Sequence, residues 1–83
     1  MENEHISAKR IWFDATHIFV ELNDGRIIGS PLHWFPRLLN APIPQRENFK
    51  ISKSGYAIHW PDLDEDLSAE GFLTFTKHTE KVL

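Results

Sequence analysis

The chain has 83 residues, with 12 acidic and nine basic side chains, five histidines and no cysteine, so its formal net charge is −3. This length is enough for one domain and too short for two. The lack of cysteine excludes disulfides and thiolate–zinc sites, and the acidic balance disfavours a protein that wraps nucleic acid with a basic face.

Residues 1–5 are acidic and polar. A secretory signal would begin with basic residues followed by an apolar run, and a membrane-spanning helix needs about 18 consecutive apolar residues. Neither pattern is present, so we expect a cytoplasmic protein without a membrane segment. We also expect a flexible segment over residues 1–7, a single domain over 8–75 and a frayed tail over 76–83.

The first part of the domain has the two-residue alternation of β-strands. The predicted strands are residues 8–13, 16–22 and 26–28. In the second strand Ile18, Val20 and Leu22 share one face. Asp24 and Gly25 separate the second strand from the third, and such a pair is a strong hairpin signal because Gly tolerates a positive φ. We therefore expect a three-stranded antiparallel meander.

A short helix should follow the meander. Trp34 and Leu38 are four residues apart, as are Phe35 and Leu39, and residues at this spacing share one face of a helix. Pro36 is harmless only in the first turn, because deeper in a helix it removes a hydrogen bond and clashes with the preceding turn. The helix is therefore expected to begin near Trp34.

The last part of the chain predicts a second hairpin and a second helix. Residues 49–51 and 56–60 alternate around a turn at 53–55, and Ser68 is a suitable N-cap for a helix over 69–75. The fold class is then α+β, a mostly antiparallel sheet with two short helices packed on one face. The expected buried core comprises Val20, Ile28, Trp34, Leu38, Ile58 and Trp60.

The acidic segment, residues 62–66, is the first candidate for chemistry. Asp62, Asp64 and Asp66 alternate as the ligands of a hard-cation loop do, but an EF-hand also needs a central Gly and a Glu at its twelfth position, where this chain has Leu73. Helix capping explains these carboxylates better, with Asp62 and Glu65 at the spacing of a capping box. We predict no metal site and no cofactor.

The histidines are the second candidate. His59 lies close in sequence to the acidic segment, where a carboxylate can orient an imidazole as a general base. A small hydrolase or nuclease using His59 with the carboxylates of the segment Asp62–Asp66 is therefore an alternative function. No recognisable nucleophile motif accompanies His59, so we assign no catalytic residue and predict that the protein is not an enzyme.

The aromatic residues allow a further alternative, direct binding of single-stranded nucleic acid by ring stacking. Such platforms have basic surroundings, whereas residues 56–60 lead straight into the acidic segment. Packing in the core is the better explanation of these rings.

Arg37 is expected to meet the acidic segment. It directly follows Pro36, which fixes where the helix begins, and a guanidinium fits a carboxylate well. One hypothesis is an internal ion pair that holds the helix to the last loop. The other is that Trp34, Arg37, Asp64 and Asp66 form a recognition surface for a partner protein. We favour the ion pair, since the enrichment of Trp and Arg at interfaces is only a statistical tendency.

Three stretches carry a family resemblance: residues 22–26 (LNDGR), 31–38 (PLHWFPRL) and 58–67 (IHWPDLDEDL). In this order and spacing they resemble the bacterial family called domain of unknown function 2442. The resemblance implies a compact α+β fold and pairing with another small protein in toxin–antitoxin-like arrangements, with this family as the antitoxin. It supplies no catalytic residue. It also supplies no DNA binding, which would belong to a fused helix-turn-helix domain. We therefore expect a small protein-binding module, the antitoxin-like or accessory partner of another small bacterial protein.

Overall fold

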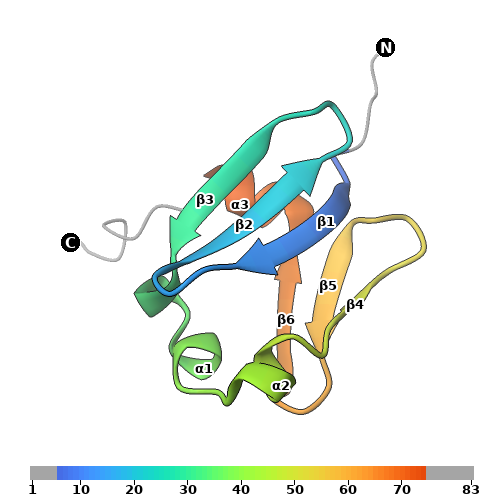
Figure 1. Ribbon diagram of the computed structural model, residues 1–83. Coiled ribbons are helices and arrows are strands. Elements are labelled where there is room, and N and C mark those ends of the chain that lie inside the picture. The colour runs from blue at the N-terminus through green and yellow to red at the C-terminus, as the bar shows by residue number, and fades with distance from the viewer. Residues whose placement is uncertain (1–5, 75–83) are drawn as a thin grey trace, which may run out of the picture.

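The computed structural model describes residues 6–74 and contains two three-stranded antiparallel sheets with short helices between and beside them (Figure 1). The sheet orders are β1-β2-β3 and β4-β5-β6. In chain order the elements are β1 (Ala8–Phe13), β2 (His17–Leu22), β3 (Ile27–Pro31), the 3-10 helix η1 (Leu32–Trp34), α1 (Pro36–Leu39), α2 (Ile43–Arg46), β4 (Lys50–Ile51), β5 (Ala57–Trp60), β6 (Glu65–Ser68) and α3 (Ala69–Thr74). The predicted α+β class is confirmed. The sequence predicted a single sheet, whereas the strands form two sheets.

The predicted meander forms the first sheet. Its central strand, β2, pairs with β1 through Ile11 and Val20 and with β3 through Val20 and Ile28. The inward side chains of β2 are fully buried, because alternate residues of a strand point to one face. Gly25 closes the β2–β3 hairpin with a φ of +96°, as the Asp-Gly pair predicted.

The helix after the meander begins later than predicted. Pro36 is the first residue of α1, and Trp34 belongs to the separate helix η1. Phe35 lies between them with φ −125° and ψ 81°, outside the helical region. The physical reason is that a proline ring crowds the preceding residue and pushes it out of the α region. The four-residue spacing of Trp34 and Leu38 is therefore not a helical one.

The acidic segment does not cap a helix as predicted. Residues 61–64 form a turn, and Glu65 begins β6, which pairs with β5 through Ile58 and Leu67. The carboxylate of Asp62 instead accepts a hydrogen bond from Asn48 Nδ2 at 2.9 Å. Asp64 has a φ of 52°, the left-handed conformation that lets the chain turn back into β6.

Ser68 caps the last helix as predicted. Its Oγ accepts a hydrogen bond from the backbone N–H of Gly71 at 3.0 Å, the usual bond between an N-cap and the third helical residue. Helix α3 contacts β2, β3 and β6, so it lies behind the first sheet in Figure 1 and joins it to the second.

One buried core connects both sheets and α3. Four of the predicted core residues, Val20, Leu38, Ile58 and Trp60, are fully buried. The other two, Ile28 and Trp34, are only partly buried and pack against the core from its edge. The remaining buried hydrophobic residues are Ala8, Ile11, Ile18, Leu22, Leu32, Phe35, Ala69 and Phe72.

Contacts with the rest of the domain begin before β1. Ile6 packs against the core, and the backbone N–H of Ser7 donates to Asn23 Oδ1 at 3.1 Å. The rest of the segment expected to be flexible, residues 1–5, and the tail over 76–83 lie outside the described residues.

Candidate functional site

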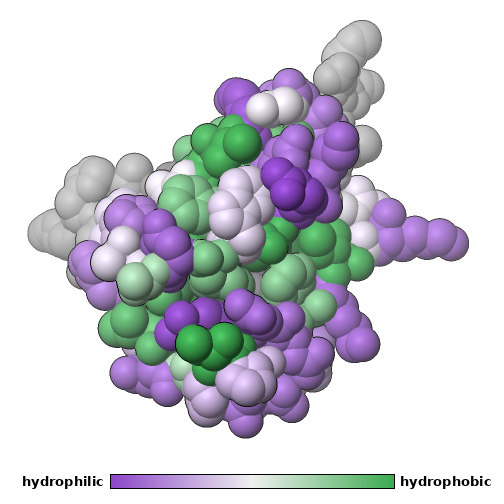
Figure 2. Space-filling view, viewed as in Figure 1, coloured by the Kyte–Doolittle hydropathy of each residue, from purple (hydrophilic) through white to green (hydrophobic). Residues whose placement is uncertain are grey.

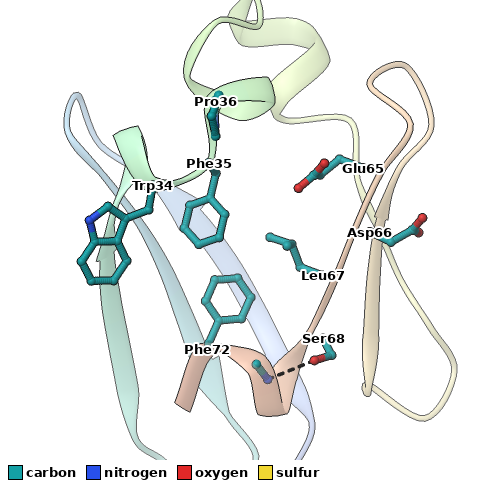
Figure 3. A pocket seen from close by; sticks show the side chains of 9 residues that line it. Trp34, Phe35, Pro36, Glu65, Asp66, Leu67, Ser68 and Phe72 are labelled. Carbon is teal, nitrogen blue, oxygen red and sulfur yellow. Dashed lines mark hydrogen bonds between the residues drawn. The ribbon is translucent and has the colours of Figure 1, made fainter. Parts of the chain in front are cut away.

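A pocket of about 390 Å³ opens between η1 and α1 on one side and β6 and α3 on the other (Figure 3). Most of its lining is apolar. Phe35 and Phe72 form its floor, with ring centroids 5.9 Å apart, and Leu67 points between them and Glu65. The full lining is Trp34, Phe35, Pro36, Glu65, Asp66, Leu67, Ser68, Gly71 and Phe72.

Strand β6 sorts the acidic side chains by its alternation. Glu65 and Leu67 point toward the pocket, whereas the carboxylate of Asp66 points away from it (Figure 3). On that other side Asp66 Oδ1 lies 2.6 Å from Nδ1 of His59, its cross-strand partner in β5. The carboxylate at the pocket therefore belongs to Glu65, which the sequence indicated as a capping partner of Asp62 and not as part of the recognition surface.

Arg37 meets the acidic segment, mainly through main-chain atoms. Its Nη1 donates to the backbone oxygen of Asp64 at 2.7 Å and more weakly to that of Leu63 at 3.4 Å. The nearest carboxylate oxygen is Oε1 of Glu65, at 3.9 Å. Arg37 thus attaches α1 to the β5–β6 turn, with Glu65 as its ionic partner in place of Asp64 or Asp66.

The environment of Glu65 disfavours its charge. Burial raises the pKa of Glu65, Arg37 lowers it, and the neighbouring Asp66 and Asp64 raise it further. The net direction is upward, so the partial removal of this carboxylate from water outweighs its attraction to Arg37. Only 22% of its side chain is exposed, compared with 59% for Arg37.

The predicted recognition surface comprises Trp34, Arg37, Asp64 and Asp66. These four residues lie at different places relative to the pocket. Trp34 lines it, and Arg37 stands beside it on α1. Asp64 lies in the adjoining turn and offers its backbone oxygen to Arg37, while the side chain of Asp66 faces His59. Trp34, Arg37 and Asp64 therefore lie at or next to the pocket, whereas the side chain of Asp66 points away from it (Figure 3).

The structure brings His59 together with only one of the predicted carboxylates, Asp66. Both side chains are largely exposed, at 45% and 70%. Asp62 is engaged with Asn48 on the preceding loop. Within residues 6–74 no three His, Asp or Glu side chains are grouped closely enough to hold a metal ion.

Some aromatic rings lie outside the core, on the open face of the first sheet. Trp12 and Phe19 are cross-strand partners with ring centroids 5.7 Å apart, and Phe19 also stacks on His17. The Arg10 guanidinium covers Trp12 at 4.6 Å and pairs with Glu21 at 2.7 Å. Hydrophobic and hydrophilic areas are interspersed on this face (Figure 2), so it does not form a continuous apolar surface.

The fold and the pocket together define a small two-sheet α+β protein with an apolar pocket that has the Glu65 carboxylate at its edge. The chain belongs to the family described as protein of unknown function DUF2442, whose model matches residues 8–78. The expected family is therefore confirmed.

Two solved structures are similar to this chain. A protein of unknown function from Rhodospirillum rubrum is 27% identical with a TM-score of 0.71, and the match covers 86% of this chain and 88% of that one. An uncharacterized protein from Chromobacterium violaceum is 21% identical with a TM-score of 0.66, covering 82% of this chain and 64% of that one, and shows the fold alone. No curated protein matches the chain.

The helices of the described region are short. None of them has the length and apolar composition that crossing a membrane requires.

Proposed function

We propose that this chain is a cytoplasmic protein-binding module, the antitoxin-like or accessory partner of another small bacterial protein. The pocket between η1–α1 and β6–α3 is the observation that carries the proposal. Binding sites are typically concave and mostly apolar, with a few polar groups that fix orientation. Phe35, Leu67 and Phe72 supply the apolar part here, and Glu65 supplies the polar one.

The residues around the pocket suit recognition of a protein. Trp34 is partly buried against the core while lining the pocket, and Arg37 is more than half exposed beside it. Trp and Arg are the residue types that most often dominate the energy of protein interfaces. The hydrogen bonds from Arg37 to the β5–β6 turn hold both sides of the pocket in place, so a partner would meet a preformed surface.

The resemblance to a family found in toxin–antitoxin-like pairs suggests the kind of partner. An antitoxin acts by binding its toxin and needs no catalytic group of its own. The net charge of −3 would also favour a basic partner over an acidic one, because opposite charges accelerate encounter.

Affinity capture with matched variants tests the proposal. The tagged chain is used to capture proteins from lysate of the native host, and the captured proteins are identified by mass spectrometry. Trp34→Ala and Arg37→Ala should lose one specific small protein. Trp12→Ala and Arg10→Ala are matched controls on the open face of the first sheet, and they should retain it. Equal capture by all four folded variants would rule out the pocket as the interface.

A hydrolase or nuclease is the second candidate, and the 2.6 Å contact between His59 and Asp66 is the observation that favours it. A carboxylate in this position can orient an imidazole as a general base. The test is cleavage of RNA and of an activated ester by wild type and His59→Gln, with and without added divalent metal. Activity that the His59→Gln variant loses would establish this candidate.

A further inference from the structure

The charges around the pocket are unbalanced. Asp64, Glu65 and Asp66 are consecutive, but Asp66 faces His59 on the other side of β6, and the cation that stands beside Glu65 is Arg37. The shorter interactions of Arg37 are with main-chain oxygens at 2.7 and 3.4 Å, and it remains 3.9 Å from the Glu65 carboxylate. Glu65 thus lacks a close-range, charge-assisted partner of the kind that would offset its burial.

The apolar floor sets a second requirement on any occupant. Phe35 and Phe72 are at most 7% exposed, and together with Leu67 they offer ring faces and methyl groups to the pocket. An occupant must bring an apolar surface to this floor and a positive charge to Glu65. A Lys or Arg side chain satisfies both needs when it stands next to an apolar residue, because its long stem is itself apolar.

We infer that the pocket binds a basic, amphipathic segment of the partner protein, with an apolar side chain on the Phe35–Leu67–Phe72 floor and an Arg or Lys at Glu65. This inference rests on the proposed function and names the chemistry of its partner. The same charges disfavour an acidic segment, because Asp64 and Glu65 would repel it.

Short capped peptides test the inference without knowledge of the partner. The probe is N-acetyl-phenylalanyl-arginine amide, and the matched probe replaces arginine by citrulline, which has nearly the same shape and no charge. Binding is followed by NMR through the indole N–H signals of the three tryptophans. Trp34 lines the pocket, Trp60 is fully buried in the core and Trp12 lies on the distant open face. The last two signals are therefore internal controls.

The arginine probe should shift the Trp34 signal saturably at millimolar concentration while the Trp12 and Trp60 signals stay in place. Affinity for the citrulline probe should be about fivefold weaker, the upper range of a single partly exposed ion pair. Glu65→Gln should reduce the affinity for arginine to that for citrulline. Glu21→Gln, which removes a carboxylate paired with Arg10 on the other face, should leave it unchanged. Added salt should weaken the arginine probe selectively.

Equal affinities for the two probes, or an unchanged affinity in Glu65→Gln, would overturn the inference. The same holds if the Trp34 signal does not move at about 10 mM probe, a concentration that would reveal even weak association. None of these results would contradict the proposed function, which depends on the lysate capture by the Trp34 and Arg37 variants. The opposite outcome would be retained peptide binding together with equal capture of the partner by wild type, Trp34→Ala and Arg37→Ala, which would contradict the proposed function and leave the inference standing.

Discussion

At the scale of single residues, Trp60 connects three parts of the fold. Its ring is fully buried and lies 5.8 Å from that of Phe49. Its indole Nε1 donates a 2.8 Å hydrogen bond to the backbone oxygen of Arg46, the last residue of α2. Arg46 in turn donates from Nε to the backbone oxygen of Leu38 in α1. A tryptophan side chain can combine apolar burial with a directed hydrogen bond, and Trp60 does both.

Replacing Trp60 should therefore destabilise the protein strongly. Trp60→Ala should lower the free energy of unfolding by about 3–5 kcal/mol, because it leaves a large cavity. Trp60→Phe keeps an aromatic ring but removes the donor to Arg46, and it should cost about 1–3 kcal/mol. Urea unfolding followed by circular dichroism measures both. A Trp60→Ala variant whose urea midpoint equals that of wild type would contradict the burial of this ring.

Glu65 and Asp14 should affect stability in opposite directions as the pH changes. Burial raises the pKa of Glu65 above its ordinary value of 4.5. Folding therefore favours the protonated form of Glu65. Protonated Glu65 contributes to the stability of the fold below pH 4.5, and this contribution is lost as the pH rises through the pKa of the folded state.

The pKa of Asp14 is lowered from 3.8, mainly by backbone hydrogen bonds from Thr16 and His17. Its contribution is present above that value and lost as the pH falls through the folded pKa.

Two neutral substitutions separate these effects. Urea midpoints of wild type, Glu65→Gln and Asp14→Asn are compared at several values between about pH 3 and about pH 7. Glu65→Gln should gain stability relative to wild type as the pH rises above 4.5. Asp14→Asn should be less stable than wild type at neutral pH and approach it as the pH falls below 3.8. If the urea midpoints of all three proteins changed with pH in the same way, neither the pKa of Glu65 nor that of Asp14 would be shifted by folding.

At the scale of elements, the sequence predicts the strands, turns and helix starts that depend only on residues close together in the chain. Strands β1, β2 and β3 follow from alternation and an Asp-Gly turn, and the N-cap Ser68 predicts where α3 begins. Strand β6 was missed because residues 65–68 (EDLS) contain a single large apolar residue, and pairing with β5 makes them a strand. The floor of the pocket depends on the same pairing, since Leu67 reaches Phe35 only in the folded chain. The sequence thus indicated Trp34 and Arg37 as recognition residues, but it indicated Glu65 only as a capping partner of Asp62.

The turns of the two sheets give a prediction at this scale. Gly25 and Gly55 both have a positive φ, which costs other residues about 1–2 kcal/mol. At Gly25 an added Cβ would meet nothing within 4 Å, so Gly25→Ala should cost only that amount. At Gly55 it would lie 2.6 Å from Ser7 Cβ and 3.1 Å from the backbone oxygen of Ala8. The Gly55 oxygen also accepts a bond from the Ala8 N–H at 2.7 Å, which ties the β4–β5 turn to β1.

Gly55→Ala should therefore be the more destabilising substitution of the two. Chemical denaturation of both variants measures the difference directly. The comparison is internally controlled, because the backbone strain is common to both and only the crowding differs. Equal losses of stability would mean that the β4–β5 turn does not rest against β1.

At the scale of the whole molecule, neither sheet has a core of its own. The buried face of β2 supplies Ile18, Val20 and Leu22, and β5 supplies Ile58 and Trp60 to the same cluster. Isolated sheets of this size are only marginally stable in water unless an apolar face is covered. The sheets are thus expected to fold and unfold together. The pocket depends on this folding as well, because its lining residues in η1, α1, β6 and α3 are held by the shared core.

Native-state hydrogen exchange with a substitution in one sheet tests this cooperativity. Val20→Ala creates a cavity in the first sheet and should lower stability by about 1–3 kcal/mol. In a single cooperative unit, the most protected amides of β2 and of β5, such as those of Val20 and Ile58, should lose the same free energy of exchange. If the β5 amides kept their protection while those of β2 lost it, the sheets would be separate units. Equal losses would mean that a mutation far from the pocket can affect the proposed partner binding only through the population of folded protein. Trp34→Ala and Glu65→Gln, in contrast, change the proposed binding surface itself.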